Sequence, residues 1–181
     1  DGGGDAAGGQ AGMANGMRSG CGAEAVADAR RVAGLLGIDF HELDLREEFS
    51  SRLLRYFADE YARGRTPNPC MLCNRWFKFG RLAEFADRIG ADYLATGHHV
   101  RLERRDDGRV ALRRGMDPAK DQSYFLAMVA PSVLGRVLLP IGGMTKEQVR
   151  DHARALGLGV HEKPESQDVC FASQVAYGQL V

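Results

Sequence analysis

The chain has few cysteines and no surplus of charge of either sign. Four cysteines among 181 residues are too few for a scaffold held together by disulfides. The formal net charge is zero, with 24 basic and 24 acidic residues, which excludes a uniformly basic nucleic-acid-binding protein. No apolar run approaches the roughly 18 residues that a membrane span needs. The sequence also shows no basic segment followed by an apolar one, the pattern of a secretory signal.

Charge is nevertheless distributed unevenly along the chain. Hydrophobic residues make up 44% and charged residues 27%, as in an ordinary globular domain. Residues 22–62 contain nine acidic and five basic side chains, whereas residues 63–81 contain five basic and no acidic ones. Residues 101–120 contain seven basic and four acidic ones. Such local positive charge indicates a polyanionic partner; a solvated arginine-rich face is the alternative.

The hydrophobic pattern predicts alternating helices and strands after a tail. Residues 1–20 contain eight glycines and are expected to form a flexible tail. Apolar spacing predicts helices over residues 23–36, 47–61, 75–89, 123–129, 131–137 and 146–156. It predicts strands over residues 38–45 and 92–96, and a hairpin that pairs residues 100–102 with 110–112. This alternation is typical of an α/β layer with parallel strands.

A proline-rich segment carries the first group of reactive residues. Pro67 and Pro69 predict an extended loop, because each proline fixes its own φ and restrains its predecessor. Cys70 and Cys73 then form a CxxC motif, which is compatible with a redox pair, half of a zinc site or no special role. A zinc site needs two further ligands, and the sequence has no second CxxC. Nearby basic residues favour a thiolate of lowered pKa.

Three further polar clusters follow along the chain. Residues 95–99, Ala-Thr-Gly-His-His, come after a predicted strand, where open α/β sheets bind ligands. Residues 117–126 place a Lys-Asp-Gln triplet before an aromatic segment; capping of a helix by Asp121 is the structural alternative. Residues 163–171 hold Cys170 in a polar segment, and an inert buried thiol is the alternative there. A structural histidine is likewise the alternative for His98.

In this order and spacing the four clusters resemble the tRNA-specific 2-thiouridylases of the MnmA/TrmU type. The similarity runs from about Cys21 to Phe171. The matching segments are GRTPNPCMLCNRWFKFG, ADYLATGHHVRL, RRGMDPAKDQSYFL, LPIGGMTKEQVRDHARALGL and KPESQDVCF. The resemblance implies part of an adenine-nucleotide-hydrolase-like α/β domain, with a doubly wound parallel sheet, and the start of a small second domain.

The resemblance also implies the chemistry and the partners. A member of this family uses ATP, with magnesium, to activate the 2-oxygen of the wobble uridine in tRNA, and then replaces that oxygen with sulfur. Cys170 would carry the sulfur as a persulfide, and Cys73 would be the nucleophile that forms a transient disulfide with it. Gly97 matches an ATP contact. The matching tRNA contacts are Asn68, Pro69, Cys70, His98, Lys120, Asp121 and Gln122.

The resemblance further implies a sulfur-carrier or cysteine-desulfurase relay protein as a partner. It implies no bound metal or organic cofactor and no membrane association. The expected compartment is the cytoplasm, with a mitochondrion or plastid as the alternative.

The chain departs from the family pattern at both ends. The family begins with a strand and a Ser-Gly-Gly-x-Asp-Ser phosphate loop, whereas residues 1–7 lack both hydroxyls. We therefore expect a chain truncated at both ends, whose own ATP binding is poor. Its expected parts are the tail 1–20, a partial catalytic domain 21–130, and residues 131–181 as the end of that domain and the start of the next. The alternatives are a tRNA-binding fragment without an ATP site and a CxxC redox or zinc module.

Overall fold

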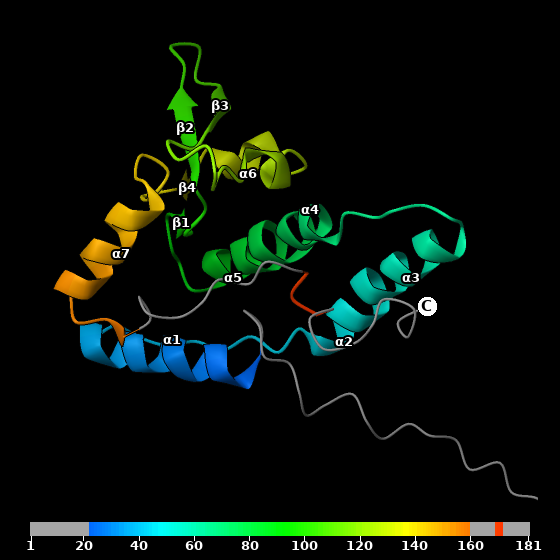
Figure 1. Ribbon diagram of the computed structural model, residues 1–181, viewed down its shortest axis with the longest axis horizontal. Helices are drawn as coiled ribbons and strands as arrows, with labels where there is room; N and C mark the ends of the chain where they lie inside the picture. Colours follow the sequence, from blue (N-terminus) through cyan, green and yellow to red (C-terminus); the bar gives the residue numbers. More distant parts are fainter. Residues whose placement is uncertain (1–21, 160–168, 172–181) are drawn as a thin grey trace, which may run out of the picture. The chain divides into compact units, whose positions relative to one another are not determined.

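A computed structural model describes residues 22–159 and 169–171 (Figure 1). The chain divides into two compact units, one formed by Asp1–Leu43 with Pro164–Val181 and the other by Asp44–Lys163. The second unit contains every described strand and all described helices except the first. No helix in the described ranges combines the length and the apolar character that crossing a membrane requires.

The first unit contains helix α1, Ala23–Leu36, as the sequence predicts. The helix ends at Gly37, which has a φ of 65° and donates its N–H to the carbonyls of Ala33 and Gly34. The strand predicted over residues 38–45 is wrong, because this segment is irregular. Side chains attach it to α1 instead: the Arg30 guanidinium bonds to Glu42 at 3.1 Å and lies 4.6 Å from the centre of the Phe40 ring.

Two long helical segments form one side of the second unit. The first runs through α2 (Arg46–Glu48), the π-helical turn η1 (Phe49–Leu54) and α3 (Arg55–Ala62). The second runs through α4 (Pro69–Cys73), the π-helical η2 (Asn74–Arg81) and α5 (Leu82–Arg88). Both predicted helices are confirmed within these segments.

Aromatic side chains and one carboxylate join the two segments. The Phe49 and Phe77 ring centres are 5.5 Å apart, and the Arg52 guanidinium lies 4.7 Å from the centre of the Trp76 ring. Glu48 accepts hydrogen bonds from Arg81 and Arg52, which lower its pKa to about 2. Glu48 is therefore ionised at neutral pH and fixes η2 against α2 and η1.

The strands form two small pairs. Strand β1 (Leu94–Ala95) pairs in parallel with β4 (Val137–Leu138), and β2 (Val100–Arg104) pairs antiparallel with β3 (Val110–Arg114). The hairpin is confirmed, and the strand predicted over residues 92–96 is confirmed in shorter form as β1. Its parallel partner β4 lies where the sequence predicts the end of a helix. Figure 1 shows the hairpin projecting away from α4 and α5.

The elements between and after the strands differ in part from the predictions. The helix predicted over residues 123–129 is only one 3-10 turn, η3 (Ser123–Leu126). The helix predicted over residues 131–137 ends early as α6 (Pro131–Leu134), because the chain then enters β4. The last helix is confirmed as α7 (Lys146–Ala155), which begins with a capping box between Thr145 and Gln148.

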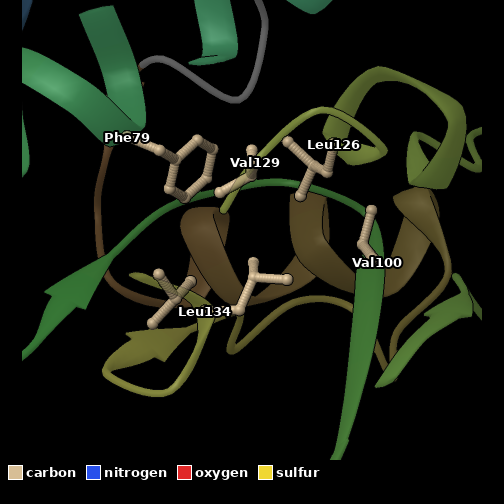
Figure 2. Close-up of a cluster of buried hydrophobic side chains, with 6 residues drawn as sticks. Phe79, Val100, Leu126, Val129 and Leu134 are labelled. Carbon is tan, nitrogen blue, oxygen red and sulfur yellow. The ribbon is translucent and has the colours of Figure 1, made fainter. Parts of the chain in front are cut away.

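The core of the second unit lies where these elements meet. Figure 2 shows side chains from η2, β2, the η3 region and α6 pointing toward one another. The buried members of this cluster are Phe79, Val100, Leu126, Val129, Leu134 and Val137. Each buried side chain of this size contributes roughly 1.5–3 kcal/mol of burial energy, so the cluster fixes the starts of β2 and β4 on the helices.

Gly142 permits the closest backbone approach in this core. A Cβ atom at Gly142 would lie 1.8 Å from the carbonyl oxygen of Val100, whereas one at Gly143 would meet nothing within 4 Å. We therefore expect Gly142→Ala to destabilise the fold by about 2–4 kcal/mol, through forced backbone movement. Gly143→Ala is the matched control and should change the free energy of unfolding by less than about 1 kcal/mol. Denaturant unfolding measures both, and equal effects would contradict this account.

Candidate functional site

Three of the four predicted clusters meet in the second unit. Gln122 of the Lys120–Gln122 segment bonds to His99 of the Gly97–His99 loop. Asn74, directly after the α4 turn that carries Cys70 and Cys73, bonds to Phe125, which follows the same segment. The fourth cluster, around Cys170, belongs to the first unit. The structure describes only Val169–Phe171 of that cluster, because residues 163–168 lie outside the described residues.

The CxxC motif lies on a helical turn and not in the extended loop predicted over residues 64–74. Asn68 caps this turn by accepting a hydrogen bond from the Met71 N–H at 3.3 Å, and Pro69 occupies the first helical position. Proline is favoured there because its missing N–H needs no partner in the first turn. The loop prediction is therefore wrong from Pro69 onward, and Asn68 and Pro69 act locally as the start signal of a helix.

The two cysteines of the motif are one helical turn apart. Both are half-buried, and they are not joined to each other by a disulfide. Burial raises the pKa of the Cys70 thiol, although the charge of nearby Lys78 opposes this. Cys70 is thus a protonated thiol at neutral pH, and the expectation of a lowered pKa from basic surroundings is wrong for this residue.

Asn74 links the CxxC turn to the segment that follows Gln122. Its side-chain amide donates to the carbonyls of Cys70 at 3.0 Å and Phe125 at 3.4 Å. Asn74 is only 4% exposed, and its Oδ1 atom has no hydrogen-bond partner among the described residues. The sequence analysis missed this residue, and its position directly after Cys73 was the only available signal.

The loop after β1 places Gly97 at the surface and two histidines inside. Gly97 is exposed at the carboxyl end of a parallel strand, while His98 and His99 are buried. His98 Nδ1 lies 2.9 Å from the Thr96 hydroxyl, and the His98 ring packs against Phe79 with centres 5.6 Å apart. Burial and, secondarily, the charge of Lys78 lower the pKa of His98 to about 4. His98 is therefore neutral at pH 7 and acts as a hydrogen-bonding group, not as a cation.

Gln122 forms hydrogen bonds with both the N–H and the carbonyl of His99. Its Oε1 accepts from the His99 N–H at 2.9 Å, and its own N–H donates to the His99 carbonyl at 3.2 Å. Neither ring nitrogen of His99 has a hydrogen-bond partner in the described part of the chain. Gln122 thus holds the Gly97–His99 loop in place. His99, which belongs to the predicted 95–99 cluster but was given no role of its own, is a second buried polar residue.

Asp121 joins Gly115, which directly follows β3, to Ser123, the first residue of η3. It accepts hydrogen bonds from the Gly115 N–H at 3.0 Å and from the N–H and hydroxyl of Ser123. Partial burial acts to raise its pKa, but these hydrogen bonds outweigh burial and keep the pKa of Asp121 below its usual value. The structural alternative for Asp121, stabilisation of the following turn, therefore describes what its side chain does in this structure. Lys120 is half-buried beside it.

The positive window 63–81 is more nearly neutral in three dimensions than in the sequence. Arg63 and Arg65 pair with Glu60, and Arg81 pairs with Glu48 and Glu84. Two exposed cations of the window form no ion pair within the described ranges, namely Arg75 and Lys78. The positive charge at the site therefore comes from few side chains, of which Lys78 acts electrostatically on both Cys70 and His98.

The described residues show no metal-binding group, and an open hollow lies away from the three clusters. In the described residues, no group of three or more His, Cys, Asp or Glu side chains is arranged to hold a metal ion. An open hollow of about 520 Å³ lies at the far end of the hairpin, lined by Glu103, Arg104, Arg105, Asp106, Asp107 and Arg113, and does not include any residue of the three clusters. The glycine-rich start of the chain falls outside the described residues.

Comparison with known proteins identifies the family. Residues 9–174 match the family model described as the tRNA methyl transferase HUP domain. The chain belongs to this family. The predicted adenine-nucleotide-hydrolase-like α/β class is thereby confirmed, since the HUP domain is of this type and β1 and β4 are parallel.

Relatives in this family bear a common name. The chain is 47% identical over 178 residues to the tRNA-specific 2-thiouridylase MnmA of Rhodopirellula baltica, covering 98% of the chain and 44% of that protein. It is 54% identical over 146 residues to the protein of the same name from Syntrophotalea carbinolica, covering 81% of the chain and 41% of that protein. The predicted family resemblance is confirmed, and the chain spans less than half the length of these relatives.

The buried state of His98 leads to a prediction about acid stability. Its folded-state pKa of about 4 lies below the ordinary value of 6.5, so as pH falls from 6.5 to 4 only the unfolded chain gains the proton. The free energy of unfolding should therefore decrease by about 3 kcal/mol over this range. Above pH 7 this effect should be absent. His98→Asn keeps an acceptor near Thr96 but does not titrate. Unfolding free energies measured from pH 8 to 4 should therefore fall more steeply for the wild type than for the variant, and parallel curves would contradict a buried neutral His98.

Proposed function

We propose that this chain forms part of an enzyme that replaces the 2-oxygen of a uridine in tRNA with sulfur. The observation that carries the proposal is the meeting of the CxxC turn, the Gly97–His99 loop and the Lys120–Gln122 segment at one place beside β1. Membership of the HUP-domain family and the 2-thiouridylase names of its relatives support a tRNA substrate and sulfur chemistry. The carboxyl end of a parallel strand is where such folds bind nucleotides.

The proposed reaction has two stages. ATP adenylates the uridine 2-oxygen and releases pyrophosphate, which makes a poor electrophile reactive because AMP becomes its leaving group. The Cys73 thiolate then attacks the inner sulfur of a persulfide on Cys170, so that a Cys73–Cys170 disulfide forms and the outer sulfur leaves as hydrosulfide. Hydrosulfide adds to carbon 2, AMP departs with the original oxygen, and a thiol reductant restores both cysteines.

The described residues support distinct tasks in this scheme. Asn68, Pro69 and Cys70 form the turn proposed to meet the target base, and the raised pKa of Cys70 keeps that thiol out of nucleophilic competition with Cys73. His98 is proposed to recognise tRNA as a neutral imidazole, since its pKa excludes a permanent charge–phosphate contact. Recognition of an unpaired base by such polar groups is typical of single-stranded RNA binding.

Other parts of the proposal concern partners and positions. Gly97, exposed beyond β1, is proposed as an ATP contact, with magnesium bound through the nucleotide phosphates. Lys120 is proposed to contact tRNA, while Gln122 and Asp121 hold the segment that presents it. A sulfur-relay protein is proposed to load the persulfide, and the cytoplasm is the proposed compartment, as in the bacterial organisms of the relatives.

Methyl transfer, which the family description mentions, is the second candidate. It requires no pair of cysteines, whereas the chain carries Cys73 and Cys170 in its two matching motifs. Sulfur transfer is therefore the better-supported reaction.

A chimeric enzyme tests the reaction. We expect that the chain, placed in the Rhodopirellula baltica 2-thiouridylase instead of the matching segment, supports ATP-dependent formation of 2-thiouridine in a tRNA transcript. Cys73→Ser and Cys170→Ser should each lower the rate at least about 100-fold, because each removes a sulfur that reacts. Cys70→Ser is the matched control and should retain at least about a tenth of the rate. Mass spectrometry of nucleosides measures the product, and equal loss in all three variants would contradict the assigned roles.

The chain alone tests the pairing of the thiols. We expect mild oxidation to join Cys73 to Cys170, and a thiol reductant to reopen the bond readily, because a catalytic disulfide must be reducible. Peptide mapping after alkylation identifies the bridge. If Cys70–Cys73 were the dominant bridge, the CxxC redox alternative would be favoured and Cys170 would lose its role.

A further inference from the structure

Two arginines lie directly opposite each other on the β2–β3 hairpin. Arg101 is the register partner of Arg113, so their side chains share one face and their Cβ atoms are roughly 4.5–5.5 Å apart. Both side chains are exposed. Like charges in this arrangement destabilise a hairpin unless an anion lies between or beside them.

The acidic groups nearby neutralise only part of this charge. Glu103 bonds to Arg113, whereas Arg101 uses its Nε to bond the carbonyl oxygen of Arg114 at 2.9 Å and forms no ion pair within the described residues. Arg114 is 89% exposed and reaches Asp121 only at 3.9 Å. Asp121 is already occupied by three hydrogen bonds from Gly115 and Ser123. On the face shared by Arg101 and Arg113, Glu103 is therefore bound to Arg113 and leaves the charge of Arg101 without a carboxylate partner.

This arrangement contrasts with that of Arg109 on the same hairpin. Arg109 bonds to Asp107 through both its backbone N–H and its side chain, so the far end of the hairpin carries its own carboxylates. Many other arginines of the second unit pair with a nearby carboxylate, as Arg65 does with Glu60 and Arg136 with Asp87. Arg109 is therefore a hairpin arginine with a carboxylate partner, whereas Arg101 has none in the described part of the chain.

The base of the hairpin also adjoins the candidate site. Arg114 is followed by Gly115, whose N–H bonds to Asp121, and Arg101 follows the buried His99–Val100 pair that Gln122 holds. Figure 1 shows β2 and β3 leading away from β1 and β4, clear of α4 and α5. The hairpin base is therefore close in sequence and hydrogen bonding to the Gly97–His99 loop, where an RNA strand is proposed to bind.

We propose that Arg101 and Arg113, the opposed pair on the β2–β3 hairpin, bind a backbone phosphate of the RNA outside the anticodon base contact. Two arginines whose Cβ atoms are roughly 5 Å apart on one face can both extend their guanidinium groups to the oxygens of one phosphodiester. The exposed face suits a continuous RNA strand better than a nucleotide, which folds of this class bind in a crevice. The proposal rests on the proposed tRNA substrate and adds a docking surface to it.

Binding of an unmodified tRNA transcript to the full chain tests this surface. Arg101→Gln should weaken binding about 3- to 10-fold and reduce the slope of log K against log salt by about 1, because one phosphate contact is lost. Arg101→Lys should fall between the wild type and Arg101→Gln, since it retains the charge but loses the fork. Arg109→Gln removes the same charge from the same hairpin, but Arg109 is bonded to Asp107. The affinity of this variant should stay within about twofold of the wild type, and its salt slope should be unchanged.

The outcomes separate this proposal from the proposed function. Wild-type binding to tRNA with equal effects of Arg101→Gln and Arg109→Gln would overturn the docking surface and leave the tRNA substrate standing. Weakened ATP binding with unchanged tRNA binding in Arg101→Gln would also overturn it, in favour of a nucleotide phosphate. Absence of tRNA binding by the wild type would overturn the tRNA substrate and this surface together. Thermal unfolding of each variant, expected within about 2 °C of the wild type, verifies that the exposed substitutions leave the fold intact.

Discussion

The close packing of backbone around His99 and Val100 is the constraint on which the second unit depends. Gly115 approaches the His99 carbonyl so closely that a Cβ would lie 2.4 Å from its oxygen, and Gly142 approaches Val100 more closely still. Gln122 bonds both polar groups of the His99 backbone. Because Met116 also donates its N–H to the Gly142 carbonyl at 2.9 Å, these contacts form one connected set. The hairpin, the Lys120–Gln122 segment and the loop before α7 are therefore fixed by the same two residues.

This packing explains the chemical character of the site. Side chains placed inside such a backbone cluster lose contact with water, so His98 is neutral at physiological pH. Asn74 fixes the CxxC turn to the same cluster through the Phe125 carbonyl. The polar groups at the proposed base-binding turn are consequently hydrogen-bonding groups of fixed position, and charge enters from the periphery, through Lys78 and the arginines of the hairpin base. The proposed base contact and the proposed phosphate contact therefore lie at separate positions in the second unit.

The sequence predicts those elements whose signals are local. Helix α1 and helix α7 follow from their apolar spacing and from Gly37 and Thr145 at their ends, and the hairpin follows from two β-rich runs around a glycine turn. The strand predicted over residues 38–45 fails because a strand needs a partner, and its own residues bond instead to Arg30. The prediction of a loop where α4 begins is wrong for a different reason. Proline marks loops and first helical positions alike, and only the Asn68 cap distinguishes the two.

The candidate site shows the same limit for side chains. Motif resemblance finds residues that belong to a known pattern, such as Cys73 and His98, but it does not find Asn74 or His99, whose significance arises from burial. Counting charges along the sequence overstates the positive field of residues 63–81, because Glu48 and Glu60 lie outside that window yet neutralise three of its arginines. Charge that acts on a ligand is the charge left after such pairing. In the second unit this remainder includes Arg75 and Lys78 of that window and Arg101 on the hairpin.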